Sequence, residues 1–364
     1  MIEGTPAKDQ YFIESYKNHL PEDTKQNMIN KYMHEMIQTD QKQFSREELR
    51  ERIAHWMGPE RVPKQFSIIT DTTDFYRVDY DDVVILGEIP YLIRNNEREG
   101  RFGIDDQQKF WVKRARDLSD GSVKIIKLVF HERFQSKVGG ITFDCFRSPQ
   151  KEARILDLTK GHPRFMQGFA LKDSSNNVIR IIDYIKGKTL ADAVLKYGQG
   201  HEDYFYNYFP SIFDEYVELV EAIRFLHEHD DKHGDIRRDH VIREDGTEHS
   251  RWIDFDFDFL HKENVFGYDL FGLGNILTYL TGRGDVTSQL LQQASSPVIK
   301  QLTEHDMNII FNNRVVNLKK VYPYVPAELN SILLHFSMAA NVFYDNTDQL
   351  LNDLNEARVK LNKP

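Results

Sequence analysis

Several features are scarce in this chain of 364 residues, and each absence narrows its class. Cys145 is the single cysteine, so neither an intramolecular disulfide nor a zinc site of several thiolates can form. The longest purely apolar runs span about four residues, such as Val83–Leu86, whereas a helix needs ~20 to cross a bilayer. The first residues lack a basic region followed by an apolar stretch, so no secretory signal is visible. We therefore expect a cytoplasmic protein without a membrane span.

The chain also has fewer basic than acidic residues. The 47 Lys and Arg residues face 57 Asp and Glu, which gives a formal net charge of −10. Such an acidic chain binds nucleic acid or anionic membrane poorly in a non-specific way, so we expect no nucleic-acid partner. A hydrophobic content of 40% is enough for a large core. At ~150 residues per domain, the length indicates two domains, or one two-lobed domain with an extension.

The hydrophobic pattern changes along the chain. Residues 1–80 carry apolar residues at helical spacing, as from Met28 to Ile37, and Ser45 with Glu48 predicts a capped helix. That helix carries Leu49, Ile53 and Trp56 on one face, which we expect to be packing surface. Short runs rich in β-branched and aromatic residues follow from 81, with a hairpin turn predicted at Asp120-Gly121, and a capped helix is predicted from Ser148. After Gly187 the pattern is mostly helical, with long periodic stretches such as 203–229. We therefore expect an α+β protein with a helical extension (1–80), a β-rich lobe (81–185) and a helical lobe (186–364).

One segment carries the residues of phosphoryl-transfer chemistry. A charged loop, His233-Gly234-Asp235-Ile236-Arg237-Arg238-Asp239-His240, is followed by Ile253-Asp254-Phe255-Asp256. Phosphoryl transfer needs one carboxylate to accept the proton of the attacking hydroxyl and another to hold a metal. We place Asp254 on a strand where acids alternate with phenylalanines. The competing interpretation of that strand is an edge strand with a wet acidic face.

The two motifs together resemble the catalytic loop and the metal-binding motif of protein kinases. The resemblance implies that Asp235 is the catalytic base and that Asp254 binds the metal. Arg237 occupies the position of a phosphate-contacting lysine and keeps its positive charge. An ATP cofactor and a Mg²⁺ or Mn²⁺ ion are implied in the same way.

The resemblance extends in both directions and covers roughly residues 81–362. Lys127, in Val123–Leu128, looks like the lysine that binds ATP phosphates, and Glu152 looks like the glutamate of the αC helix that pairs with it. Backbone groups of Asp183 and Ile185 are implied as adenine partners in the interlobe hinge. Asp269 resembles the αF aspartate that buttresses the catalytic loop.

The chain departs from the family pattern at several points. The glycine-rich phosphate loop is not recognisable, and counting back from Lys127 places it near Gly103–Phe110. His240 stands where the family has a metal-binding asparagine, and imidazole suits Mn²⁺ better than Mg²⁺. Either His240 ligates the metal, or Asp239 serves instead, or one metal is lost, or the histidine is structural.

The activation segment is short as well. Only ten residues separate Asp258 from Asp269, and Gly234 replaces the arginine that reads a phosphorylated activation loop in the family. We therefore expect no regulation by activation-loop phosphorylation. The favoured function is an ATP- and metal-dependent kinase acting on Ser or Thr of a protein. The alternatives are a small-molecule or glycan kinase of the lipopolysaccharide-core type, and a pseudokinase that acts as a nucleotide-regulated binding module.

Overall fold

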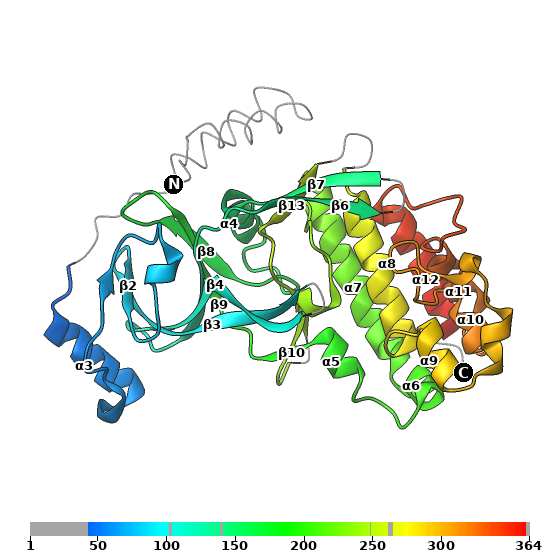
Figure 1. The fold of residues 1–364 in the computed structure, drawn as a ribbon, viewed down its shortest axis with the longest axis horizontal. Helices are drawn as coiled ribbons and strands as arrows, with labels where there is room; N and C mark the ends of the chain where they lie inside the picture. The colour runs from blue at the N-terminus through cyan, green and yellow to red at the C-terminus, as the bar shows by residue number, and fades with distance from the viewer. Residues whose placement is uncertain (1–42, 102–103, 139–140, 248, 261–264, 362–364) are drawn as a thin grey trace. The chain divides into compact units, whose positions relative to one another are not determined.

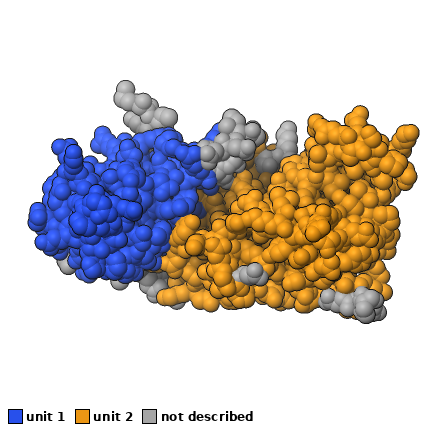
Figure 2. Space-filling view, turned by 90° about the horizontal axis from the view of Figure 1, so that it is seen from below, with its two compact units in different colours: residues 1–129, 170–181 blue, residues 130–169, 182–364 orange. Residues whose placement is uncertain are grey.

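The structure, a computed structural model, describes residues 43–101, 104–138, 141–247, 249–260 and 265–361. The helix expected near residues 28–37 lies outside these ranges. The chain forms two compact units, which Figure 2 shows in blue and orange. Unit 1 comprises Met1–Val129 and Ala170–Ile181, and unit 2 comprises Phe130–Phe169 and Ile182–Pro364.

Unit 1 is built on a sheet in which seven strands are described, in the order β1-β2-β3-β4-β5-β9-β8. The strands are β1 (Ile68–Ile69), β2 (Val83–Leu86), β3 (Ile89–Arg101), β4 (Ile104–Asp117), β5 (Val123–Lys127), β8 (Gly168–Lys172) and β9 (Val178–Asp183). Antiparallel pairing joins β2 to β3, β3 to β4 and β4 to β5. The predicted turn at Asp120-Gly121 joins β4 to β5, and Gly121 takes a positive φ there.

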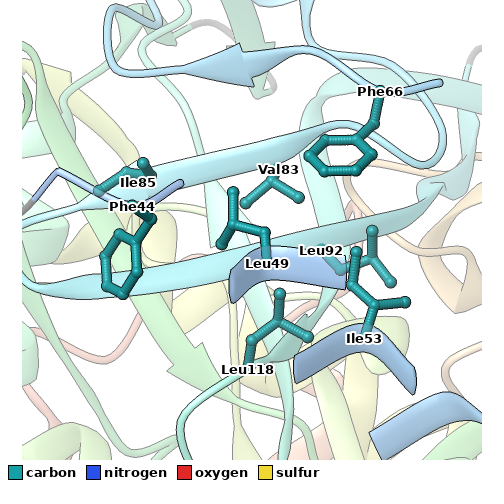
Figure 3. Packing of buried hydrophobic residues seen from close by; sticks show 8 residues of the cluster. All are labelled: Phe44, Leu49, Ile53, Phe66, Val83, Ile85, Leu92 and Leu118. Carbon is teal, nitrogen blue, oxygen red and sulfur yellow. The ribbon is translucent and has the colours of Figure 1, made fainter. Parts of the chain in front are cut away.

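The helix predicted after Ser45 is confirmed as α3 (Arg46–Met57). The Ser45 side chain accepts a hydrogen bond from the Glu48 N–H, which satisfies one of the free donors at the helix start. Leu49 and Ile53 are fully buried, and Figure 3 shows them against Val83 and Leu92 of the sheet. Residues 43–80 therefore pack as part of the sheet unit.

The two compact units do not end where the sequence pattern placed the domain boundaries. The units divide the chain at residues 129, 169 and 181, whereas the sequence pattern placed the boundaries at 80 and 185. Residues 104–110 of the phosphate loop expected near Gly103–Phe110 belong to β4, so its location stays a prediction. Arg101 of β3 pairs with Ile104 of β4, and residues 102 and 103 lie outside the described ranges. The paired ladder of two long strands outweighs the low strand propensity of this polar segment.

Unit 2 carries two small sheets. One has the order β13-β7-β6, and the other has the order β10-β11-β12. Their strands are β6 (Arg133–Val138), β7 (Ile141–Arg147), β10 (Gly187–Thr189), β11 (Val241–Glu244), β12 (Ser250–Trp252) and β13 (Phe257–Leu260). The β6–β7 hairpin therefore pairs with the segment that follows the Asp254 motif.

Helices make up most of the rest of unit 2, and α7 and α8 run side by side in Figure 1. The described helices are α4 (Pro149–Leu158), α5 (Leu190–Val194), α6 (His201–Asn207), α7 (Phe209–Glu228), α8 (Gly267–Gly282), α9 (Ser288–Gln293), α10 (Leu318–Val321), α11 (Ala327–Leu334) and α12 (Thr347–Leu361). The predicted helix 203–229 is interrupted at Tyr208, just before a proline in the first turn of α7. Among the described helices, none has the length and apolar content needed to span a membrane.

Candidate active site

A hairpin brings the two candidate motifs together. Strands β11 and β12 pair with Val241 opposite Trp252, and the Ile253 N–H donates to the His240 carbonyl at 3.0 Å. His240 is therefore the last residue of the 233–240 loop before β11, and Asp254 is the second residue after β12. The register of the hairpin explains why residues 14 positions apart in the sequence converge.

The catalytic loop is held by a buried carboxylate of α8. Asp269 accepts hydrogen bonds from the backbone N–H groups of His233 and Gly234, both at 2.8 Å, and it contacts the His227 Nε2 at 3.1 Å. Burial opposes ionisation, but these hydrogen bonds hold the pKa of Asp269 below its usual value. The buttressing role implied for Asp269 is therefore confirmed.

Asp254 adopts a backbone conformation that strands do not contain. Its φ is +69°, and the neighbouring strand β13 begins only at Phe257, so the strand predicted through Asp254 is wrong. The wet acidic face is wrong too, because Asp254, Asp256 and Asp258 are all buried. A left-handed non-glycine residue costs of order 1–3 kcal/mol and persists only where its surroundings impose it.

His240 lies between the two candidate carboxylates. Its Nδ1 is 2.8 Å from the Asp235 carbonyl oxygen, which can only accept, so Nδ1 carries the proton. Its Nε2 then accepts from the Arg237 guanidinium at 2.7 Å and lies 3.6 Å from a carboxylate oxygen of Asp254. The imidazole thus directs a lone pair toward the Asp254 side of the site.

Arg237 is surrounded by the polar groups of the loop. Its guanidinium lies 3.6 Å from the Asp235 carboxylate and 3.1 Å from the Asp239 carboxylate, in addition to its bond with His240. The Asp235 side chain is 22% exposed, so it remains accessible to an acceptor. These four residues form one cluster, which we call the loop cluster.

Glu152 contacts the same region from α4. Ser148 caps this helix as predicted, and its side chain accepts from the Lys151 N–H. The Glu152 carboxylate is fully buried and accepts from the Phe255 N–H at 3.1 Å. The residue next to Asp254 is therefore fixed by a helix that lies about one hundred positions earlier in the sequence.

The other predicted cofactor residues lie at the ends of strands. Lys127 is the last residue of β5 in unit 1 and is buried, opposite Val112 of β4. Asp183 ends β9 and its N–H donates to the Gln167 carbonyl at 2.8 Å, while Ile185 follows in the connection to β10. Lys127 belongs to unit 1, whereas the loop cluster, Glu152, Asp254 and the hinge residues belong to unit 2.

Sequence reasoning missed Arg147, which pairs with Asp256. The two side chains are 5% and 3% exposed and lie 2.7 Å apart, and Arg147 also contacts Glu132 at 2.9 Å. Burial alone would lower the pKa of Arg147, but the charges of Asp256 and Asp254 raise it above the usual value. Arg147 thus neutralises the carboxylate that stands in the glycine position of the family motif.

Lys151 and Arg154 were also missed, although they lie in the same helical turn as Glu152. The Lys151 ammonium is fully buried and donates to the His233 carbonyl at 2.7 Å and to the Phe257 carbonyl. Arg154 forms two hydrogen bonds with Asp231, at 2.8 and 2.6 Å. Two basic residues three positions apart in a short, largely buried helix could have indicated that their charged groups have partners in the interior.

A cleft of about 270 Å³ opens beside the loop cluster. Its lining comes from the catalytic loop, from α8 and from the segment before α10, and includes Asp235, Arg237, Asn275, Phe311 and Arg314. The Asn308 amide donates to the Asn275 side chain at 2.8 Å, which ties that segment to α8. The cleft therefore presents the Asp235 carboxylate to a small, partly apolar space.

The side chains of Asp254 and His240 suit a divalent ion that also binds the phosphates of a substrate. No group of three or more His, Cys, Asp or Glu residues within the described ranges is arranged to hold a metal by itself. Asp254 and His240 nevertheless converge to 3.6 Å. Mg²⁺ in kinase-type sites commonly takes only one or two carboxylates and completes its shell with water and substrate phosphates. The residues present fit such an ion.

A β-rich unit, a helix-rich unit, a catalytic loop anchored by a buried aspartate and a left-handed Asp254 together define a protein-kinase-like α+β fold. Two relatives share this class. One is "Putative ribosomal protein S6 kinase alpha-2" of Caenorhabditis elegans, which is 22% identical over 206 residues, or 55% of this chain and 22% of the relative. The other is CBL-interacting protein kinase 11 of Oryza sativa subsp. japonica, which is 26% identical over 141 residues, or 39% of this chain and 25% of the relative.

The matched part of each relative is thus about a quarter of its length. Among solved structures, the PknI kinase domain of Mycobacterium tuberculosis aligns with 73% of this chain and 96% of its own, at 11% identity and a TM-score of 0.43. No protein-family model matches the chain. The chain is thus similar to these two kinases over part of its length, and its fold is protein-kinase-like.

Proposed function

We propose that this protein is an ATP- and metal-dependent phosphotransferase whose acceptor is a Ser or Thr hydroxyl of a protein. The observation that carries the proposal is Asp235, an accessible carboxylate on a loop fixed by Asp269 and joined through His240 to Asp254. The two relatives, both named as kinases, support a protein acceptor.

Asp235 would orient the acceptor hydroxyl and take its proton. The hydroxyl oxygen then attacks the γ-phosphorus of ATP, the bond from that phosphorus to the β–γ bridging oxygen breaks, and ADP leaves with the electron pair. Arg237 lies close enough to Asp235 to place a positive charge beside the transferred phosphoryl group. The chemistry is mainly positioning and electrostatic stabilisation, so a rigid loop is its main requirement.

The nucleotide would be held by the residues at the kinase-like positions. Asp254 and His240 would bind the Mg²⁺ or Mn²⁺ ion, which neutralises charge on the phosphates. By their resemblance to kinase positions, Lys127 would contact the α- and β-phosphates with Glu152 as its partner. Backbone groups of Asp183 and Ile185 would contact adenine.

The Asp235→Asn variant tests the chemistry directly. We expect phosphoryl transfer to fall by about 10²–10⁴, the scale of general-base assistance, while ATP binding stays within about threefold. The matched control is Asp245→Asn, which makes the same change at an exposed turn of the β11–β12 hairpin. Labelled transfer and nucleotide titration give the two readouts, and a variant as fast as the wild type would show that Asp235 is not the base.

A small-molecule hydroxyl acceptor is a second candidate, and the cleft beside Asp235 favours it. A space of about 270 Å³ lies just below the ~300–1,000 Å³ of drug-sized ligand pockets, so it suits one small group. Ile276→Trp would fill the cleft from α8. If the acceptor enters the cleft, this variant raises its KM at least tenfold, whereas transfer to a peptide that bypasses the cleft is unchanged. A panel of Ser/Thr peptides and sugars, assayed with wild type and variant, separates the two acceptors.

A further inference from the structure

We propose that Lys151 is a positioning residue that holds the catalytic loop and the segment after Asp254 in one arrangement through its buried ammonium group. The inference rests on the proposed function, because it concerns the order of the same site. It predicts that the loop is fixed by hydrogen bonds from a side chain of this chain, without an added phosphate.

The contacts of Lys151 join three elements of unit 2. The side chain leaves α4, and its Nζ donates to the His233 carbonyl at 2.7 Å and to the Phe257 carbonyl. His233 is two residues before Asp235, and Phe257 is three residues after Asp254. One ammonium group therefore links the backbones on which both candidate catalytic carboxylates depend.

The backbone at Gly234 is shaped around this contact. Gly234 has a φ of +88°, which side chains other than glycine rarely adopt. A Cβ placed on it would overlap the Phe257 carbonyl oxygen and would lie 3.0 Å from the Lys151 Nζ. The space that a side chain at 234 would need is thus taken by the lysine and the carbonyl that it binds.

Neighbouring residues of α4 act on the same segment. Lys151 binds the Phe257 carbonyl on one side of Asp256, and Glu152 binds the Phe255 N–H on the other side. Arg154, in the same turn of the helix, forms its two hydrogen bonds with Asp231, just before the loop. One turn of α4 therefore fixes both the loop and the segment after Asp254.

Burial holds the pKa of Lys151 below its usual value, and the carboxylates of Asp258, Asp269 and Asp231 oppose that shift only in part. The two hydrogen bonds to carbonyl oxygens do not depend on the charge, because a neutral amine also donates. Lys151 does not line the cleft beside Asp235, so it is not a catalytic residue. Its effect on transfer must pass through the loop and the strand that it joins.

Lys151→Met, which keeps the chain length and removes the donors, tests the inference. We expect kcat to fall about 10–100-fold while the KM for ATP changes less than about threefold. The matched control is Lys319→Met, because Lys319 also donates to a backbone carbonyl, that of Val325, but far from the loop cluster in the sequence. The control is expected to keep the wild-type kcat even if its melting temperature falls. A folded Lys151→Met with kcat within twofold of wild type overturns the proposal.

Amide hydrogen exchange separates this inference from the proposed function, because it needs no activity. We expect faster exchange in residues 233–236 and 255–258 for Lys151→Met and not for Lys319→Met. If the wild type transfers no phosphate to any acceptor, the proposed function fails, while the exchange result still decides the role of Lys151. Should Lys151→Met not fold, Lys151→Gln takes its place, because its amide is one atom shorter than the lysine and cannot reach both carbonyls. Unchanged exchange in both segments there overturns the proposal.

Discussion

At the scale of single residues, the site depends on side chains in unusual settings. Asp254 sits at a positive φ, and His240 is fixed as one tautomer by the Asp235 carbonyl. The lone pair of Nε2 accepts a hydrogen bond from the Arg237 guanidinium, and Nε2 lies 3.6 Å from a carboxylate oxygen of Asp254. A metal that binds Nε2 must therefore displace Arg237 from it, so His240 has two competing partners.

His240→Asn is expected to change the metal preference. Imidazole suits Mn²⁺ better than Mg²⁺, whereas an amide oxygen suits Mg²⁺. If His240 coordinates, the ratio of Mn²⁺-supported to Mg²⁺-supported transfer, measured at saturating ATP, falls severalfold in the variant. A ratio that does not move, with only stability altered, would mean that His240 orders the loop and that Asp254 alone binds the metal.

At the scale of elements, α4 and the β6–β7 hairpin shape the site. The capped start of α4 at Ser148 was readable from the sequence, because a local side-chain contact sets it. The pairing of β7 with β13 could not be predicted from the sequence, because it joins residues more than one hundred positions apart. This pairing places Arg147 opposite Phe257 and next to Asp256, where the buried ion pair forms.

Breaking the Arg147–Asp256 pair should be costly. We expect Arg147→Leu to lower the free energy of unfolding by about 3–5 kcal/mol, because it leaves a buried carboxylate without its cation. The double variant Arg147→Leu/Asp256→Leu should lose less than the sum of the two single losses, because no unpaired charge remains. Urea denaturation of the four proteins measures both quantities.

Arg114→Leu is the control for this cycle. Its ion pair with Glu97 on the unit 1 sheet is 2.7 Å long but partly exposed, at 35% and 24%. Exposed pairs contribute about 0–1 kcal/mol, so the loss there should be small. Equal losses for Arg114→Leu and Arg147→Leu would contradict the view that burial makes the Asp256 pair important.

At the scale of the whole molecule, the chain has one unit built on a sheet and one unit rich in helices. The loop cluster, Glu152 and Asp254 lie in unit 2, while Lys127 lies in unit 1. A half-buried histidine, His201, and a fully buried one, His233, also link the stability of unit 2 to pH. Burial lowers the pKa of His201 to about 4 and that of His233 to about 3.

These two histidines predict a loss of stability in mild acid. Their folded pKa values lie below the ~6.5 of an unfolded chain, so the unfolded state binds more protons as the pH falls below that value. The free energy of unfolding should then fall by up to about 1.4 kcal/mol per pH unit for each histidine. Urea titrations between pH 7 and 5, above the range of most carboxylates, measure this slope.

His201→Gln should flatten that slope. In the folded chain, Nε2 of His201 lies 2.8 Å from the Thr281 carbonyl and Nδ1 lies 2.7 Å from the Tyr324 hydroxyl, which satisfies the neutral ring. Glutamine removes the titrating group but can still donate to the carbonyl. A variant with the wild-type pH slope would show that His201 is not the source of the acid sensitivity.

Local patterns were enough to predict several parts of this protein: the capped helices at 46 and 149, the loop ending at His240, and the carboxylates at 235, 254 and 269. Caps, turns and motifs depend on contacts between residues close in the chain, so their pattern is readable. Only the tertiary structure decided that Asp254 leaves the strand conformation, that its neighbouring acids are buried, and that Arg147 and Lys151 bind them and their backbone. Those features arise from long-range strand pairing and desolvation, which have no signature in local spacing.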